Sequence, residues 1–331
     1  MRSSTWYWHD TMNTQQILLV AILATSIAGT AALAQPYPSK PVKVIVPLTS
    51  GSPVDVTARL VGQHMAAVLG QPMIIENRPG AGATIGAKSV AASEADGYTL
   101  LHTAANHVIA PSVYKSLTYD PIKDFAPIGA AATSPFVVVL TPNLPIHTVA
   151  ELIAHAKANP GKLNWGYGLG TSPHLIGEMF KHMTQTDIAA IPYRGGAQAV
   201  TDILAGQIHM NIGTTATLVP LVRSGKLRAI AVIGEGRYPD LPEVPTMAES
   251  GVPLSLFFWT GMLAPAGVPA DVIGKLNATL NDVLRNAELK ESMAKLGLQP
   301  KGGSPQDFAA FLDAEKAAWA NAVTTTGVKL D

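Results

Sequence analysis

The 331-residue chain contains no cysteine, and its charge is both sparse and balanced. The absence of cysteine excludes disulfides, thiolate nucleophiles and cysteine-ligated metal sites. Only 14% of the residues are charged, with 23 basic and 23 acidic side chains, so neither nucleic acid nor an anionic lipid surface is favoured as a partner. Hydrophobic residues make up 47% of the chain, which is ample for a packed core. We therefore expect a globular protein in which charge acts locally.

The chain has one long apolar run, residues 17–33, and none after it. The end of this run overlaps an A-x-A pattern at residues 32–34, which is typical of signal-peptide cleavage. We expect residues 1–34 to form a secretory signal peptide that is cleaved after Ala34. Arg2 is the only lysine or arginine upstream of the run, and translation from Met12 would remove it. The alternative is a retained membrane anchor, although the run is shorter than the ~20 residues that a span needs.

Two similar series of strands and helices are predicted in tandem. In the first series, strands are expected at residues 42–46, 73–76 and 98–102, and helices at 56–69 and 84–92. A β-branched run closed by proline, as at residues 42–46, is typical of a buried parallel strand. This βαβαβ order favours a doubly wound α/β domain with right-handed crossovers.

The second series repeats the pattern after Pro127. Its strands and helices are expected, in chain order, at residues 136–140, 149–158, 163–167, 173–183, 188–192, 197–205, 207–212 and 227–232. A strand at 256–263 then leads back towards the first series. The chain closes with helices at 270–296, with a break near Ala287, and at 305–324, which we expect to cover the first domain. We therefore expect domain 1 to comprise residues 35–135 and 258–331, and domain 2 to comprise residues 136–257.

Four polar loops each follow a predicted strand and open a predicted helix: residues 48–55, 103–106, 166–172 and 193–197. A helix that begins in such a loop presents unpaired backbone N–H groups at the positive end of its dipole, which suits a bound anion. In open α/β sheets ligands bind beyond the carboxyl ends of the strands, so two facing domains would bring these loops into one cleft. The loops therefore predict a carboxylate or phosphate site.

The candidate ligand-binding residues come from these loops and the strand ends beside them. Glycine permits close backbone approach, hydroxyls can donate to carboxylate oxygens, and arginine can pair bidentately with a carboxylate. The predicted residues are Leu48, Thr49, Ser50, Gly51, Ser52, Val54, Asp55, Thr103, Asn106, Tyr167, Gly170, Thr171, Ser172, Arg194 and Thr214.

Each of these candidates also has a simpler structural interpretation. Asp55 fits the N-cap of the helix expected from Val56, and its carboxylate would repel an anionic ligand. Ser172 fits a cap ahead of Pro173 at the first helical position. Arg194 equally fits a solvated surface position, and residues 48–55 an ordinary tight turn.

Nucleotide, metal and catalytic motifs are not found. Neither G-x-G-x-x-G nor G-x-x-x-x-G-K-[ST] occurs in the required context, and no G-x-S-x-G sequence is present. His174, Glu178 and His182 recur every four residues on one helix face, but two turns separate the outer pair by about 12 Å, too far for all three to share one ion. We therefore predict no metal, no cofactor and no catalytic residue.

Several motifs resemble the periplasmic substrate-binding proteins of tripartite tricarboxylate transporters, the Bug family. They include YPSKP at residues 37–41, ENRPGAG at 76–82, DGYTL at 96–100, PYRG at 192–195 and LAPAG at 263–267, and the similarity runs along the whole mature chain. The resemblance implies a Venus-flytrap of two α/β domains, of the type II periplasmic-binding-protein kind. It implies a small carboxylate held by loop backbone, hydroxyls and ordered waters, and docking on membrane transporter subunits.

This sequence departs from the family pattern in the first loop. The family typically has P-F-P-P-G-G-x-x-D there, whereas residues 47–55 read PLTSGSPVD, so hydroxyls replace prolines and one glycine is lost. Either an aliphatic dicarboxylate or an aromatic carboxylate remains open as ligand. His102, Trp165 and Trp259, together with Asn106 and Tyr167, are candidates for an aromatic pocket lining, or else for core positions.

Two other functions remain open at this point. The protein can present its ligand to a sensor kinase instead of a permease. A periplasmic hydrolase or lyase on the same scaffold is less well supported, because it needs a paired nucleophile and base. We expect a monomer that binds no nucleic acid.

Overall fold

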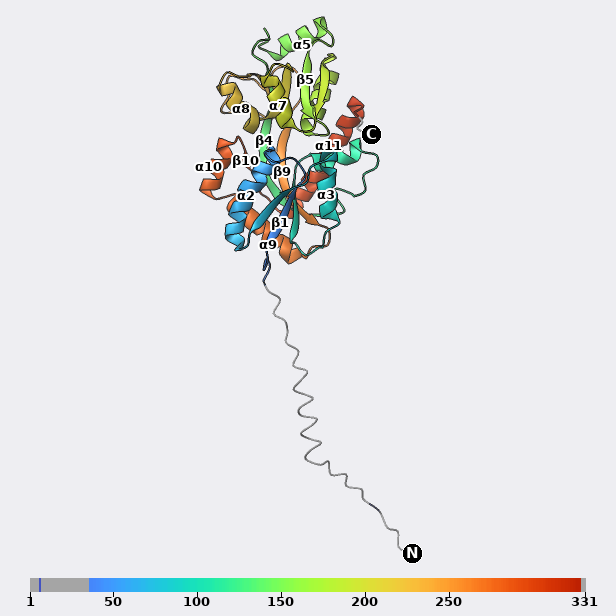
Figure 1. Ribbon diagram of the computed structural model, residues 1–331, viewed down its shortest axis with the longest axis vertical. Helices are drawn as coiled ribbons and strands as arrows, with labels where there is room; N and C mark the ends of the chain where they lie inside the picture. The colour runs from blue at the N-terminus through green and yellow to red at the C-terminus, as the bar shows by residue number, and fades with distance from the viewer. Residues whose placement is uncertain (1–5, 7–35, 329–331) are drawn as a thin grey trace. The chain divides into compact units, whose positions relative to one another are not determined.

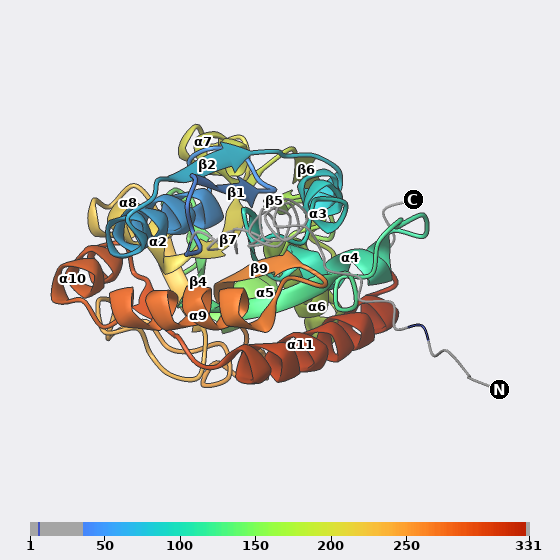
Figure 2. The same ribbon diagram turned by 90° about the horizontal axis from the view of Figure 1, so that it is seen from below.

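A curled mixed sheet with helices packed around it forms the centre of the protein (Figures 1 and 2). The computed structural model describes residue 6 and residues 36–328; apart from Trp6, the predicted signal peptide lies outside these residues. The hydrogen-bonded strand order is β2-β1-β3-β9-β4-β7-β5-β6, with β8 and β10 both paired to β4. The strands are β1 (Val42–Val46), β2 (Met73–Asn77), β3 (Thr99–Thr103), β4 (Phe125–Leu140), β5 (Asn164–Gly168), β6 (Ala189–Tyr193), β7 (Met210–Thr214), β8 (Arg228–Ile233), β9 (Phe257–Pro265) and β10 (Gln299–Pro300).

The helices follow the strands in the alternating order that the sequence predicts. They are α2 (Pro53–Leu69), η1 (Ala81–Ala83), α3 (Thr84–Ala91), α4 (Asn106–Val113), α5 (Val149–Ala158), α6 (Ser172–Thr184), α7 (Gly196–Leu204), α8 (Thr215–Arg223), α9 (Ala270–Val283), α10 (Ala287–Lys295) and α11 (Pro305–Thr326). Apart from the start of β4, the predicted strands and helices lie within a few residues of these bounds, and the predicted break near Ala287 separates α9 from α10. The α/β fold class is confirmed.

Strand β4 connects two groups of elements. Its first part, from Phe125 to Pro135, pairs antiparallel with β9, whereas Phe136 to Leu140 pair antiparallel with β7 and β8. Figure 1 shows β4 and β9 running between a group that contains α2, α3 and α9 and a group that contains α5, α7 and α8. Helix α11 contacts α4 and β4 and also α6, so it packs against elements of both groups.

The prediction that this strand begins at residue 136 is wrong by eleven residues, because β4 already begins at Phe125. Residues 125–135 contain prolines, glycine and small residues, which are weak strand formers. The pairing with β9 shifts register between Pro127 and Gly129 and again between Ala130 and Ala132, and these irregularities accommodate them. Tertiary pairing therefore decides the structure of this segment.

Two predictions about helix starts are also corrected by the structure. Helix α2 begins at Pro53, and its N-cap is Ser52, whose side chain accepts a hydrogen bond from the Asp55 N–H; Asp55 is thus inside the first turn. Helix α6 begins at Ser172 with Thr171 at the N-cap, one residue earlier than predicted. In the part of the chain that the structure describes, no helix combines the length and apolarity needed to cross a membrane.

Candidate functional site

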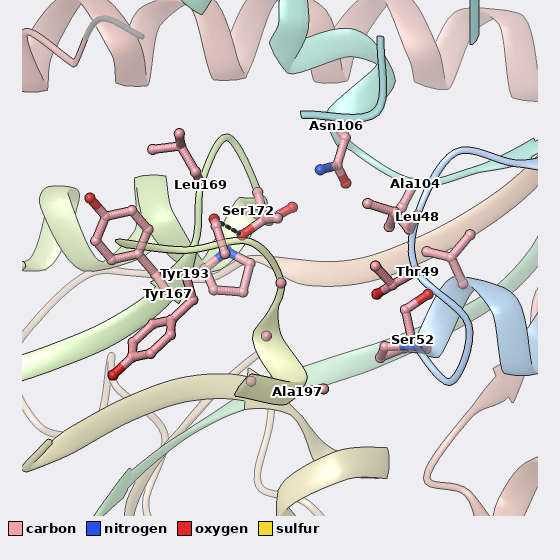
Figure 3. A pocket seen from close by; sticks show the side chains of 18 of the residues that line it. Leu48, Thr49, Ser52, Ala104, Asn106, Tyr167, Leu169, Ser172, Tyr193 and Ala197 are labelled. Carbon is pink, nitrogen blue, oxygen red and sulfur yellow. Dashed lines mark hydrogen bonds between the residues drawn. The ribbon is translucent and has the colours of Figure 1, made fainter. Parts of the chain in front are cut away.

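A pocket of about 750 Å³ lies where the loops after β1, β3, β5, β6 and β7 meet. Figure 3 shows Leu48, Thr49 and Ser52 on one side and Tyr167, Leu169 and Ser172 on the opposite side. The predicted convergence of polar loops from both series is therefore present in the fold. Eleven of the predicted residues line the pocket: Leu48, Thr49, Gly51, Ser52, Val54, Asn106, Tyr167, Thr171, Ser172, Arg194 and Thr214.

Four predicted residues are not part of this lining: Ser50, Asp55, Thr103 and Gly170. Thr103 is only 1% exposed at the end of β3. Ser50 belongs to the first loop, but its hydroxyl donates towards Asp55 Oδ2 at 3.4 Å, and Asp55 lies in the first turn of α2. The Gly170 carbonyl accepts a hydrogen bond of 3.3 Å from Asn106 Nδ2, which connects α4 to the loop before α6 next to the pocket.

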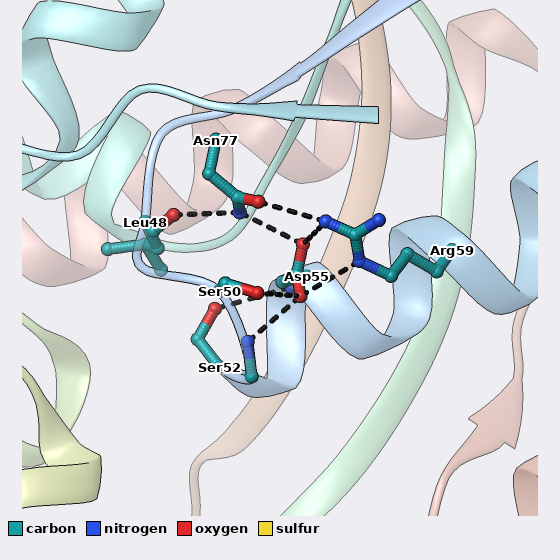
Figure 4. Close-up of polar contacts among 7 residues, drawn as sticks. Leu48, Ser50, Ser52, Asp55, Arg59 and Asn77 are labelled. Carbon is teal, nitrogen blue, oxygen red and sulfur yellow. Dashed lines mark hydrogen bonds and ion pairs between the residues drawn. The ribbon is translucent and has the colours of Figure 1, made fainter. Parts of the chain in front are cut away.

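The first loop, residues 48–52, is held from behind by the Asp55 carboxylate (Figure 4). Asp55 Oδ2 accepts from the Gly51 N–H at 2.9 Å and from Arg59 Nε at 3.1 Å, and Oδ1 accepts from Asn77 Nδ2 at 2.9 Å. Gly51 has φ +78°, a conformation that glycine adopts at low cost and other residues rarely adopt. Burial opposes ionisation of Asp55, but these hydrogen bonds outweigh it and hold its pKa below the usual 3.8.

Three helices, α6, α7 and α8, start on the other side of the pocket. Within residues 36–328, no side chain caps α6, α7 or α8. By contrast, α5, α10 and α11 begin outside the pocket lining and are capped by Thr148, Asn286 and Ser304; α9, which begins at Ala270, has no side-chain cap. The first N–H groups of α6, α7 and α8 therefore have no side-chain acceptor in front of them at the positive ends of these helices, although Pro173 of α6 has no N–H.

Several hydroxyls near these helix starts already have partners within the protein. Thr171 Oγ1 donates to the Gly168 carbonyl at 2.7 Å, and Thr214 and Thr217 share a hydrogen bond of 3.2 Å. Tyr193 donates its hydroxyl to Asp202 Oδ2 at 2.7 Å; burial and Asp202 together raise the pKa of Tyr193 to about 12. These groups shape the pocket wall and leave donation to an anion mainly to backbone N–H groups.

Aromatic rings that the sequence did not single out complete the lining. Phe136 from β4 and Phe258 from β9 form an edge-to-face pair with centroids 6.4 Å apart, at the place where the two strands pass between the two groups of elements. Tyr167 stacks on His174 at 4.1 Å, so one ring face is covered. Finding the two phenylalanines required knowing the long β4–β9 pairing, which the sequence prediction lacked.

Residues 79–83 form a further wall of the pocket that the prediction missed. Ala81 and Ala83 have φ +43° and +84°, which is unusual for residues with a side chain. The ENRPGAG motif contains this segment and was quoted only for the family resemblance. Its proline and glycines mark a special backbone, which is the signal that could have placed it at the site.

Three aromatic candidates lie in the core and not in the pocket lining: His102, Trp165 and Trp259. Trp259 donates its indole N–H to Glu315 at 2.7 Å, and Trp165 packs over Gly177. His102 is fully buried, and burial lowers its pKa to about 3, so its ring is neutral at pH 7. The alternative interpretation of these residues as core positions is confirmed.

Charge in the pocket comes from one side chain. Among the described residues that line it, Arg194 is the only one whose side chain is charged at pH 7. Of the earlier metal candidates, His174 stacks on Tyr167 and Glu178 pairs with Lys181 at 3.1 Å. The pocket therefore combines one cation, many backbone donors and an aromatic floor, which suits a small organic anion.

This fold and pocket define a solute-binding receptor of the periplasmic type. A family model described as the tripartite tricarboxylate transporter family receptor, TctC, matches residues 57–328, and the chain belongs to this family. Protein BugT of Bordetella pertussis is 36% identical over 325 residues, covering 96% of this chain and 100% of the relative. The family consists of solute-binding receptors and not of enzymes, so the hydrolase or lyase alternative ends here.

Two similar solved structures carry ligands in their names. A Rhodopseudomonas palustris protein with adipate has a TM-score of 0.84 and 35% identity, covering 88% of this chain and 99% of the other. MatC from Rhodopseudomonas palustris with bound malate has a TM-score of 0.82 and 29% identity, covering 87% of this chain and 100% of the other. The two-domain flytrap class expected from the motifs agrees with these neighbours.

Proposed function

We propose that this protein captures a small carboxylate in the pocket and delivers it to the membrane subunits of a tripartite tricarboxylate transporter. Residues 1–34 act as a signal peptide that is removed after Ala34, so that the mature monomer works in the periplasm. The ligand's carboxylate meets the N–H groups of the loops and helix starts. Membership of the receptor family and the names of the adipate and malate neighbours support this proposal.

One observation carries the carboxylate proposal: α6, α7 and α8 begin at the pocket with no side-chain cap among the described residues. A side-chain oxygen at these positions would occupy the same N–H groups that an anionic ligand uses. Arg194 adds the charge that a bidentate carboxylate contact needs.

The carbon skeleton of the ligand lies over the Phe136–Phe258 pair. An apolar floor stabilises an unbranched methylene chain or an aromatic ring better than a compact hydroxylated skeleton, because hydroxyls buried there would lose hydrogen bonds to water. Adipate-like dicarboxylates and aromatic carboxylates are therefore preferred over malate.

Ligand capture involves two domains, residues 35–135 with 258–331 and residues 136–257. The proposed boundary at residues 135 and 136 coincides with the point where β4 changes partners. A ligand that contacts loops of both domains at once stabilises the closed arrangement by its differential affinity, and this shifts the population towards it.

A thermal-shift screen of the mature protein tests the proposal, with adipate, malate and benzoate as probes and phosphate and sulfate as inorganic controls. A ligand at 100 times its Kd adds about 2.7 kcal/mol of stability, which is a shift of several degrees for a chain of this size. Stabilisation by at least one carboxylate, with adipate or benzoate above malate, is expected. No shift with any of the three carboxylates at millimolar concentration would contradict the proposal.

Delivery to a transporter needs its own test, because presentation to a sensor kinase predicts the same binding. The transporter role predicts that uptake of the carboxylate into cells requires both this protein and the membrane subunits. Intact uptake after deletion of the gene, together with loss of ligand-dependent transcription, would favour the sensor role instead.

A further inference from the structure

We propose that Asp55 is a positioning residue that holds the loop at residues 48–52, and that Thr49 is the hydroxyl of this loop that contacts the ligand. The inference rests on the proposed function of the pocket. It assigns different roles to residues that the sequence treated as one set of ligand contacts.

The first argument is the number of contacts made by a buried carboxylate. Asp55 is 1% exposed, and its two oxygens accept from the Gly51 N–H and Ser50 Oγ of the loop, from Arg59 of α2 and from Asn77 of β2. A buried carboxylate with several hydrogen bonds fixes its donors strongly, since each donor would otherwise leave a desolvated charge unpaired. Asp55, which does not line the pocket, therefore holds the loop through these contacts (Figure 4).

Asn77 extends this support to the start of the loop. Its Nδ2 donates to the Leu48 carbonyl at 3.0 Å as well as to Asp55, and its Oδ1 accepts from Arg59 Nη2 at 3.0 Å. The backbone at Leu48 and at Gly51 is thus attached to one network. The orientation of the backbone between these two points is set from behind and not by the ligand.

The second argument concerns the three hydroxyls of the loop. Ser50 Oγ donates towards Asp55 Oδ2 at 3.4 Å, and Ser52 Oγ accepts from the Asp55 N–H at 3.3 Å. The Thr49 hydroxyl, by contrast, has no hydrogen-bond partner among residues 36–328, and Thr49 is exposed and lines the pocket. A methyl group added at Gly195 would lie 3.5 Å from Thr49 Oγ1, so Thr49 lies where the two sides of the pocket come near each other. Ser52 Oγ keeps its own proton, but Thr49 is the one hydroxyl of this loop with no hydrogen-bond partner at all within residues 36–328, and it is the one we assign to the ligand.

The charge of Asp55 allows an experiment to distinguish a positioning role from a purely electrostatic effect on the ligand. A carboxylate behind an anion site repels the ligand, so removing its charge without changing its shape would tighten binding if charge were its only effect. A positioning role predicts the opposite, because Asn offers an N–H₂ group where Gly51 and Arg59 both need an acceptor. The sign of the change in affinity decides between these roles.

The experiment is calorimetric titration of wild-type protein, Asp55→Asn and Thr49→Val with whichever of adipate, malate and benzoate stabilises the wild type most. Asp55→Asn is expected to bind at least about tenfold more weakly, and its amides in residues 48–55 are expected to exchange hydrogen faster than in the wild type. Thr49→Val is expected to bind about three- to tenfold more weakly with unchanged exchange. Asp282→Asn is the matched control, because Asp282 of α9 also pairs with an arginine, Arg285 just beyond the helix, but is exposed; it should change neither property.

Each outcome has a distinct meaning. Equal or tighter binding by Asp55→Asn overturns the positioning role, and unchanged binding by Thr49→Val overturns the role of Thr49. If Asp55→Asn fails to fold, Asn77→Ala and Ser50→Ala test the same network, and unchanged affinity and exchange in both would overturn it. Absence of binding by the wild-type protein would instead contradict the proposed function itself.

Discussion

The two loops that face each other across the pocket are held in different ways. Residues 48–52, between β1 and α2, are attached to Asp55 and Asn77 and end in a helix with a side-chain cap. Residues 194–195, between β6 and α7, end in a helix whose N-cap is Gly195 and which no described side chain caps. The Arg194 side chain is exposed and has no hydrogen-bond or ion-pair partner within residues 36–328.

The difference indicates a division of roles in the proposed site. The β1–α2 loop is already in one conformation, so a ligand that meets its N–H groups loses little free energy in ordering them. The β6–α7 loop offers an exposed cation without a partner among the described residues, so binding a ligand costs it side-chain entropy. We expect geometry to decide affinity on the first side and charge to decide it on the second.

The largest expected effect is that of acid, which should lower the stability of the whole fold without loosening the β1–α2 loop. His102 and His107 are fully buried, and burial lowers their pKa values to about 3 and about 4. Both rings therefore stay neutral in the folded protein while they are protonated in the unfolded chain below pH 6.5. Stability is lost as the pH falls below 6.5, by about 2 kcal/mol for each histidine between pH 7 and pH 5.

The Asp55 network also loses its contribution as the pH falls, but in a lower pH window than the histidines. Because the folded pKa of Asp55 lies below 3.8, its contribution is complete above the unfolded value and is lost only as the pH falls through the lower folded value. Urea unfolding at pH 7 and pH 5 should show this loss of stability. The difference in unfolding free energy between the two pH values should be smaller in His102→Met. Hydrogen exchange of residues 48–55, corrected for the intrinsic effect of pH, should stay unchanged; a large increase at pH 5 would contradict this assignment.

Arg194→Ala tests the charge on the second side and has the next largest expected effect. Loss of a charge-assisted contact at an exposed position should weaken adipate binding about tenfold in Arg194→Ala and less in Arg194→Lys. The affinity of Arg194→Ala for adipate should also depend less on salt than that of the wild type. Stability should change by less than about 0.5 kcal/mol, since the side chain is exposed. Arg285→Ala, another exposed arginine, serves as control. Unchanged affinity in Arg194→Ala would remove this residue from the site.

A matched pair of glycine substitutions compares the backbones of the two loops, and its expected effects are the smallest. Both Gly51 and Gly196 have open space where a Cβ would lie, but only Gly51 has positive φ. Gly51→Ala should lower the free energy of unfolding by about 1 kcal/mol and weaken ligand binding. Gly196→Ala, at the start of α7, should leave stability unchanged or slightly higher. Equal effects of the two substitutions on stability would contradict the backbone account.

The sequence predicted the alternating elements and the convergence of polar loops because both depend on local pattern. Apolar runs ending in glycine and hydroxyl residues identify strand ends, and the carboxyl ends of neighbouring strands meet at one edge. Eleven of the predicted residues line the pocket for this reason. The family resemblance then identified a receptor, which the comparisons confirm.

The features that sequence could not supply depend on pairing between distant segments. Asp55 looked like a helix cap, and only the approach of Asn77 from β2 shows that it supports the loop. Phe136 and Phe258 became pocket residues because β4 and β9 pair along residues that are poor strand formers. His102 and Trp259 lie in the paired strands β3 and β9, and Trp165 of β5 packs over Gly177 of α6, so all three are buried by contacts that composition alone does not reveal.

Hydrogen exchange of the mature protein with and without adipate most directly tests the claim that one carboxylate is held by both sides of the pocket. The account predicts slower exchange on ligand addition in residues 48–55 and in residues 193–197 together, with less change in α5 and α10, which lie outside the pocket lining. Protection of only one of the two loops, at a concentration that saturates binding, would contradict it.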